Sequence, residues 1–181
     1  MEETQPRHRF LGPALGALVA VGLALGYFWL LAPESSKVKV GVQAPDLDLP
    51  SVGPGRVKLS SFKGQAILLV FFMSDCHICQ TEILEIERIH REYRLRNLLV
   101  VGVSVDADYT ATQRFINERS LSFGLLRDPH GEQIGKQYGS YKMPEAYLID
   151  AQGVVRAVWL GSVKWRSPEV RREIEALLPA K

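Results

Sequence analysis

Beyond residue 40, unbroken apolar runs alternate with amphipathic stretches. Residues 66–72 form one apolar run and residues 98–105 a second, and each predicts a buried strand. Between them, Ile83, Ile86 and Ile89 recur on one face of a helix predicted over residues 77–96. Two apolar strands separated by a helix are typical of a parallel βαβ unit at the centre of a sheet.

Turn and capping signals divide the rest of this region into short elements. Asp106 or Asp108 can cap a helix that runs to about residue 120, and Ser167 can cap a last helix that ends near residue 178. We also expect a hairpin over 47–49 and 57–59, an extended piece at 122–126, a short helix at 132–138, and a second hairpin over 146–149 and 154–160. The order predicts an α/β fold with a mixed central sheet, helices on both faces and an N-terminal β-hairpin extension.

The N-terminal part of the chain predicts a membrane anchor. Residues 11–32 carry no charge, and their length of 22 residues exceeds the roughly 20 that span a bilayer. Aromatic residues 27–29 lie near the far end, where rings favour the membrane interface. Pro33 follows the one position suited to signal cleavage, so we expect an uncleaved anchor. The predicted organisation is a tail over 1–10, a transmembrane helix over 11–32, a tether over 33–40 and a globular domain over 41–181.

Flanking charges leave the orientation of this anchor open. Arg7 and Arg9 precede it and Lys37 and Lys39 follow it, so the positive-inside count is a tie. A short inner tail and a large outer domain are the usual arrangement. We therefore expect a single-pass protein of the cell membrane whose domain is extracytoplasmic, on the periplasmic side in a Gram-negative cell. That compartment would suit disulfide chemistry.

Composition limits the possible functions. Hydrophobic residues make up 46% of the 181 residues and charged residues 23%, which fits one globular domain with an appendage. The formal net charge is only +2. It provides no basic footprint for nucleic acid.

The chain has two cysteines, Cys76 and Cys79, and they stand between the first apolar strand and its helix. N–H groups at a helix start stabilise a thiolate, the form that attacks disulfides. Haem attachment needs a histidine directly after the second cysteine, and Gln80 is there instead. Zinc needs four ligands, and the four histidines are scattered. A structural disulfide would close only a tight loop. The pattern therefore favours a redox dithiol with no cofactor and no metal.

Two further positions are candidates for the site. Met143-Pro144 precedes a predicted strand, and an X-Pro bond can be cis at low cost. A cis bond would leave the Met143 backbone free to pair with an extended substrate. A trans proline at the start of a strand is the alternative, and the dipeptide alone favours it, but together with C-x-x-C and the βαβ order the cis form is favoured. Glu82 falls on the apolar face of the predicted helix with Cys79. Burial disfavours a charged carboxylate, so Glu82 could exchange a proton with Cys79; the alternative is an exposed first turn.

Five motifs taken together resemble one family. They are Ala44-Pro45-Asp46, Leu-Ser-Ser-Phe-Lys-Gly at 59–64, Cys76-x-x-Cys79-x-x-Glu82, Asp-Pro-His-Gly at 128–131 and Met143-Pro144. Over about residues 40–178 the chain resembles the TlpA/ResA-like membrane-anchored thiol:disulfide oxidoreductases of the thioredoxin fold. The resemblance implies that Cys76 attacks, Cys79 resolves, Glu82 assists with protons and Pro144 is cis. It also implies a protein thiol or disulfide substrate, often apocytochrome c, and a membrane electron donor.

Several positions around the pair depart from the family pattern. Asp75 stands where tryptophan is usual, His77 and Ile78 stand where the pair often encloses a proline, and Glu145 replaces a threonine or serine. Asp75 and Glu145 would place negative charge beside the site. His77 could stabilise the Cys76 thiolate if charged, or could simply be solvated. These changes leave the reduction potential and the substrate class open.

Two other functions fit parts of the pattern. A peroxiredoxin-like peroxide reductase shares the Ala-Pro-Asp opening, but it needs threonine or serine three residues before its cysteine, where this chain has Met73. A metal-delivery module of the same fold uses a wider C-x-x-x-C with a distant histidine. The spacing here is shorter, so disulfide exchange remains the main prediction.

Overall fold

A computed structural model of the protein describes residue 22 and residues 36–179. The chain divides into two units, Met1–Glu34 and Ser35–Lys181. The described residues include no helix long and apolar enough to cross a membrane. The predicted tail and anchor, residues 1–10 and 11–32, lie outside the described residues apart from Gly22, so they stay predictions.

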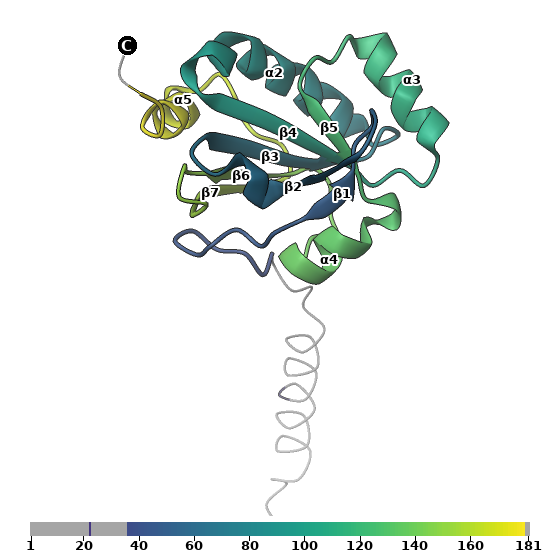
Figure 1. The fold of residues 1–181 in the computed structure, drawn as a ribbon, viewed down its shortest axis with the longest axis horizontal. Coiled ribbons are helices and arrows are strands. Elements are labelled where there is room, and N and C mark those ends of the chain that lie inside the picture. Colours follow the sequence, from purple (N-terminus) through teal and green to yellow (C-terminus); the bar gives the residue numbers. More distant parts are fainter. Residues whose placement is uncertain (1–21, 23–35, 180–181) are drawn as a thin grey trace, which may run out of the picture. The chain divides into compact units, whose positions relative to one another are not determined.

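A five-stranded mixed sheet forms the centre of the second unit (Figure 1), with strand order β5-β4-β3-β6-β7. Its members are β3 (Ala66–Phe72), β4 (Leu98–Ser104), β5 (Gly124–Arg127), β6 (Glu145–Ile149) and β7 (Val155–Leu160). β3, β4 and β5 are parallel, whereas β6 and β7 each run antiparallel to their neighbours. Every residue of β3 is buried, as its apolar run predicts. The mixed sheet is confirmed, with β5 shifted slightly from the expected extended piece.

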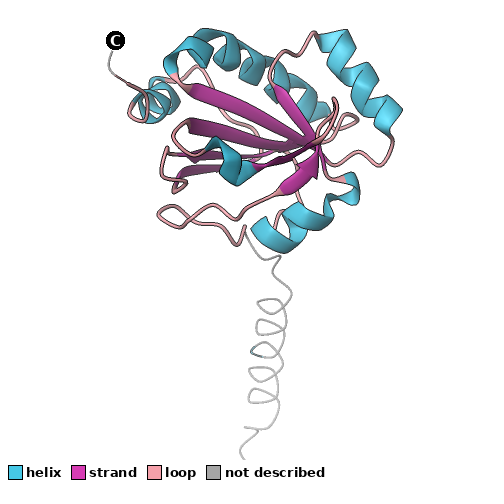
Figure 2. Ribbon diagram, viewed as in Figure 1, coloured by secondary structure: helices cyan, strands magenta, loops and turns pink. Residues whose placement is uncertain are grey.

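Helices cover both faces of the sheet (Figure 2). They are α2 (His77–Tyr93), α3 (Tyr109–Arg119), α4 (Glu132–Tyr138) and α5 (Pro168–Glu175), with short 3-10 turns at Leu59–Phe62, Arg94–Arg96 and Pro129–Gly131. Apolar side chains of α2, α3 and α5 share one core with alternate residues of β3, and α4 packs on the opposite face. Asp108 and Ser167 cap α3 and α5. The end of the predicted helix 77–96 tightens into the 3-10 turn.

The N-terminal hairpin is a separate two-stranded sheet, β1 (Asp48–Pro50) and β2 (Arg56–Lys58). Leu47 and Leu49 anchor it in the core on the α4 side. Packing against the domain begins earlier than Gly41, because Ser36 and Val38 are buried and the Lys37 N–H donates to the Tyr138 carbonyl at 2.8 Å. The last residues of the predicted tether therefore contact the domain directly.

Candidate active site

The two cysteines lie where β3 ends and α2 begins, joined as a disulfide with their Cα atoms 5.2 Å apart. Cys76 is the N-cap residue of α2, and its Sγ accepts a hydrogen bond from the Cys79 N–H at 3.2 Å. Cys79 is fully buried, whereas Cys76 is only partly covered. The chain thus presents one sulfur, that of Cys76, toward solvent and directs a backbone N–H at it.

The loop before β6 lies beside the exposed sulfur. The Met143–Pro144 peptide bond is cis, which confirms the sequence prediction. The Met143 carbonyl oxygen is 4.0 Å from Cys76 Sγ. Pro144 is buried, and its carbonyl accepts a hydrogen bond from Gly161 N–H at 2.9 Å, just after β7. The pairing of β3 with β6 therefore brings Cys76 and Met143 together, although they are 67 positions apart in sequence.

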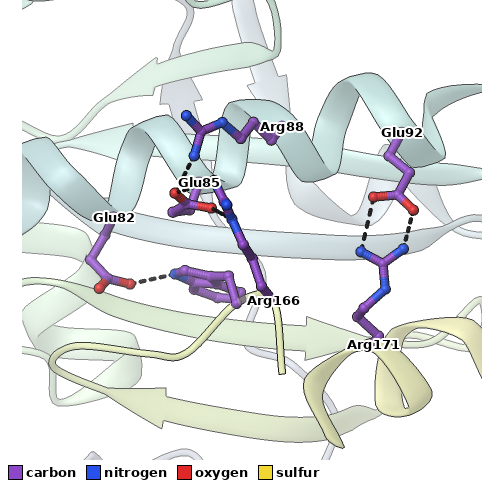
Figure 3. A network of polar contacts seen from close by, with 7 residues as sticks. Glu82, Glu85, Arg88, Glu92, Arg166 and Arg171 are labelled. Atoms are coloured by element: carbon purple, nitrogen blue, oxygen red, sulfur yellow. Dashed lines mark hydrogen bonds and ion pairs between the residues drawn. The ribbon is translucent and has the colours of Figure 1, made fainter. Parts of the chain in front are cut away.

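Glu82 is buried, with 4% of its surface exposed, so the alternative of an exposed first turn is wrong. Its carboxylate accepts hydrogen bonds from Ser162 Oγ at 2.8 Å, from Val163 N at 3.2 Å and from Trp165 Nε1. All three donors belong to the segment between β7 and α5, and Glu82 points toward that segment (Figure 3). The sequence predicted the burial of Glu82 but not these partners, which tie α2 to the β7–α5 connection.

Glu145 follows Pro144, yet its side chain is buried. It lies on the same side of β6 as Tyr147, whose hydroxyl donates to its Oε2 at 2.7 Å. Tyr147 belongs to the core on the α4 side of the sheet, away from α2. Burial raises the pKa of Glu145 despite the hydrogen bond from Tyr147. Glu145 therefore directs its carboxylate to the face of the sheet opposite α2, not beside the sulfurs as the sequence suggested.

Asp75 and His77 flank Cys76 and both are exposed. Either can add charge at the open side of the disulfide, as predicted from their positions. A surface pocket of about 460 Å³ lies next to them and is lined by Met73, Ser74, Asp75, Val105, Asp106, Ala107, Asp108, Ala111 and His130. Within the described part of the chain, no group of three or more His, Cys, Asp or Glu side chains is arranged to hold a metal ion.

Sequence reasoning missed one residue near the site. Asp106 was considered only as a possible cap of α3, and Asp108 fills that place. Instead, Asp106 is buried and accepts the Ser74 N–H at 2.9 Å, in the loop that leads to Cys76. The sequence did contain a signal for this role of Asp106. The residue follows the carboxyl end of a buried parallel strand, and functional sites of α/β folds lie at that edge of the sheet.

Comparison with known proteins places the chain in a family. The model of the AhpC/TSA family matches residues 40–158. The thiol-disulfide oxidoreductase ResA of Bacillus thuringiensis subsp. konkukian is 28% identical over 138 residues, which cover 75% of this chain and 77% of that protein. The thioredoxin-like protein YneN of Bacillus subtilis is 27% identical over 160 residues, covering 84% and 93%.

Solved structures give the same result. A protein assigned as the thiol:disulfide interchange protein DsbE of Chlorobium tepidum superposes with a TM-score of 0.72 and 29% identity, over 78% of this chain and 99% of that one. The thioredoxin domain of a thiol-disulfide oxidoreductase from Bacteroides vulgatus shares the fold, with a TM-score of 0.70 at 19% identity over 79% and 100%. The chain therefore belongs to the AhpC/TSA family, and within it to the TlpA/ResA-like redoxins of the thioredoxin fold.

Proposed function

We propose that this protein is a thiol:disulfide oxidoreductase that exchanges disulfides with protein substrates through Cys76 and Cys79. The observation that carries the proposal is the asymmetry of the pair at the start of α2. Cys76 is partly exposed and its Sγ receives the Cys79 N–H, whereas Cys79 is fully buried. An N–H and a helix start directed at one accessible sulfur favour its thiolate, which is the attacking species.

In the reducing direction, two exchanges follow. The Cys76 thiolate attacks one sulfur of a substrate disulfide, forms a mixed disulfide and releases the other substrate sulfur as a thiolate. The Cys79 thiol loses its proton and attacks Cys76 Sγ, which releases the second substrate thiolate and closes the Cys76–Cys79 bond. Two electrons pass from the pair to the substrate. Glu82, buried on the same helix, assists by accepting the proton of Cys79.

The finer features of the proposal concern location and direction. We propose that residues 11–32 anchor the protein in the cell membrane with the redox domain on the extracytoplasmic side. The resemblance to TlpA/ResA-like proteins favours a reductant that converts substrate disulfides, including that of apocytochrome c, to thiols and is recharged by a membrane thiol–disulfide relay. The uncharged stretch before the domain supports the anchor.

Insulin-disulfide reduction tests the chemistry. The wild-type protein should reduce insulin in the presence of a thiol donor, and Cys76→Ser should abolish the activity. Measured in parallel, the reduction potential of the pair distinguishes a reductant from an oxidant. If the protein reduces peroxide at a rate comparable to that of insulin reduction, the proposed disulfide exchange is wrong and the protein is a peroxide reductase.

Location has a separate test. Full-length protein should sediment with membranes and stay there in alkaline carbonate, and protease added to intact spheroplasts should digest the redox domain. Recovery of the protein in the soluble fraction would refute the anchor without affecting the exchange chemistry.

A further inference from the structure

The backbone of Ser74 is held on both sides by side chains, one at each of the two peptide groups that flank its Cα. Its N–H donates to Asp106 Oδ1 at 2.9 Å, and its carbonyl accepts from Gln80 Nε2 at 3.0 Å. Asp106 stands just after β4, whereas Gln80 belongs to the first turn of α2. We call Ser74, Gln80 and Asp106 the Ser74 clamp. Ser74 lies within the turn over residues 73–76 that carries the attacking sulfur, and in this turn the Cys76 N–H donates to the Met73 carbonyl at 3.3 Å.

The Asp106 arm of the clamp is built into the core. Asp106 is 7% exposed, and its second oxygen accepts from Ser104 Oγ at 2.8 Å and from Thr112 Oγ1 at 3.1 Å. A buried carboxylate is costly unless its oxygens are hydrogen-bonded, and here both are. Thr112 belongs to α3, so this helix supports the carboxylate that holds Ser74.

The Gln80 arm leads to the same helix. Gln80 Oε1 accepts from Arg119 Nη2 at 3.1 Å, and the Arg119 guanidinium lies over the Phe115 ring, 4.5 Å from its centroid. Arg119 is the last residue of α3. Both arms therefore connect the backbone of one loop residue, Ser74, to α3, a helix that supplies no sulfur and no proline to the redox site.

We propose that Gln80 and Asp106 are positioning residues which, by holding the backbone of Ser74, keep Cys76 Sγ aligned with the N–H of Cys79. The inference rests on the proposed disulfide exchange, in which Cys76 attacks. The hydrogen bond from Cys79 N–H to Cys76 Sγ depends on distance and angle. If the turn over residues 73–76 moves relative to α2, that hydrogen bond weakens and less Cys76 is ionised at neutral pH.

Other charged groups around Cys76 also influence its ionisation and must be controlled. Those nearest in the chain are Asp75 and His77. Glu82 comes from α2, and Asp106 and Asp108 come from the β4–α3 connection. Arg119 ends α3, His130 lies in the turn before α4, Lys142 precedes β6, and Glu145 is the first residue of β6, on the face away from α2. Gln80 is uncharged, so its replacement changes the clamp without changing this set.

The decisive measurement is the pH dependence of Cys76 alkylation by iodoacetamide in the reduced full-length protein, followed by peptide mass spectrometry. In Gln80→Ala the midpoint should move to higher pH, and the rate at pH 7 should fall about two- to tenfold, the range expected for one lost hydrogen bond. Thr81→Ala, an exposed neighbour on the same turn of α2, should keep the wild-type profile. An unchanged midpoint in Gln80→Ala would overturn the proposal.

A double-mutant cycle tests whether the two arms act together. Asp106→Asn should alkylate more slowly than Asp108→Asn, which has the same change of charge and keeps a good N-cap for α3. Because both arms hold the backbone of one residue, the double variant Gln80→Ala/Asp106→Asn should lose less than the product of the two single losses. If the alkylation rate of the double variant falls by the full product of the two single decreases, the two arms act independently and the proposal is refuted. If Asp106→Asn does not fold, the comparison of Gln80→Ala with Thr81→Ala still decides.

Alkylation needs no protein substrate, so this result is independent of the proposed function. A wild-type protein that alkylates at Cys76 but reduces no disulfide would refute the proposed function. The alkylation profiles of the clamp variants would still report on the position of Cys76.

Discussion

Replacing Glu82 with glutamine separates its structural role from its proton role. Both carboxylate oxygens of Glu82 accept hydrogen bonds, Oε1 from Ser162 and Val163 and Oε2 from Trp165. A glutamine amide has one acceptor oxygen and one donor nitrogen. Whichever way the amide turns, its NH₂ group meets at least one donor. At least one donor is therefore left without an acceptor, either the buried Trp165 Nε1 or the partly buried Val163 N–H.

The number of donors left without an acceptor sets the expected loss of stability. One buried donor without a partner costs about 1–3 kcal/mol, so we expect Glu82→Gln to destabilise the domain by about 2 kcal/mol. In a domain of this size, 1 kcal/mol shifts the melting temperature by about 2–4 °C. The expected decrease is then about 4–8 °C. Glu85→Gln is the matched control, since Glu85 pairs with Arg88 and Arg166 at the surface (Figure 3). Surface pairs contribute about 0–1 kcal/mol.

Thermal unfolding by circular dichroism and the pH–rate profile of insulin reduction provide the two measurements. If Glu82 also accepts the Cys79 proton, Glu82→Gln slows exchange and changes the pH–rate profile, whereas Glu85→Gln changes neither. A lower melting temperature with an unchanged profile would refute the proton role and leave Glu82 as a link between α2 and the β7–α5 segment. A melting temperature equal to that of Glu85→Gln would refute the hydrogen-bond reasoning itself.

Three further predictions concern the pair, a buried acid and the core. Cys79→Ser should accumulate mixed disulfides between Cys76 and substrate, visible on non-reducing gels; if no adduct forms, the assigned order of attack is wrong. Glu145→Gln should stabilise the protein at pH 7. Burial raises the pKa of Glu145, so the folded state binds the proton more tightly than the unfolded state does. The stability of the wild type therefore falls as the pH rises above the ordinary pKa of 4.5. That advantage should disappear below pH 4.5, and parallel curves of melting temperature against pH would contradict it. Gly102→Ala should lower the free energy of unfolding, measured by chemical denaturation, by about 1–3 kcal/mol, because its Cβ would lie 2.8 Å from Leu125 Cδ2 and 2.9 Å from the Phe123 ring. A variant as stable as the wild type would show that these side chains move aside without cost, contrary to the prediction.

Local patterns predicted much of the domain. The apolar runs at β3 and β4, the isoleucine stripe of α2 and the Ser167-Pro168 start of α5 each depend on residues close in sequence, and each element formed where expected. The redox pair was equally predictable, because a strand followed by C-x-x-C and a helix start places both sulfurs through local geometry alone. Glu82 was assigned to the buried face from helical spacing.

Contacts between distant segments were not predictable in the same way. The spacing of Glu82 cannot show that its partners come from residues 162–165, because those meet α2 only after β6 and β7 have joined the sheet. The face of β6 on which Glu145 lies depends on register, and a shift of one residue would reverse it. That register buries Glu145 beside Tyr147, and burial raises the pKa of its carboxyl group.

The sequence by itself determined the chemistry: two cysteines at a helix start, in a chain with no other sulfur to pair with them. The tertiary structure decided how that chemistry is held. Asp106 and Gln80 both reach the backbone of Ser74, in the loop before Cys76, because β4 lies beside β3, and Arg119 at the end of α3 then bonds Gln80. A local pattern can specify which atoms react, but their alignment depends on hydrogen bonds whose donors and acceptors the fold alone brings within 3 Å.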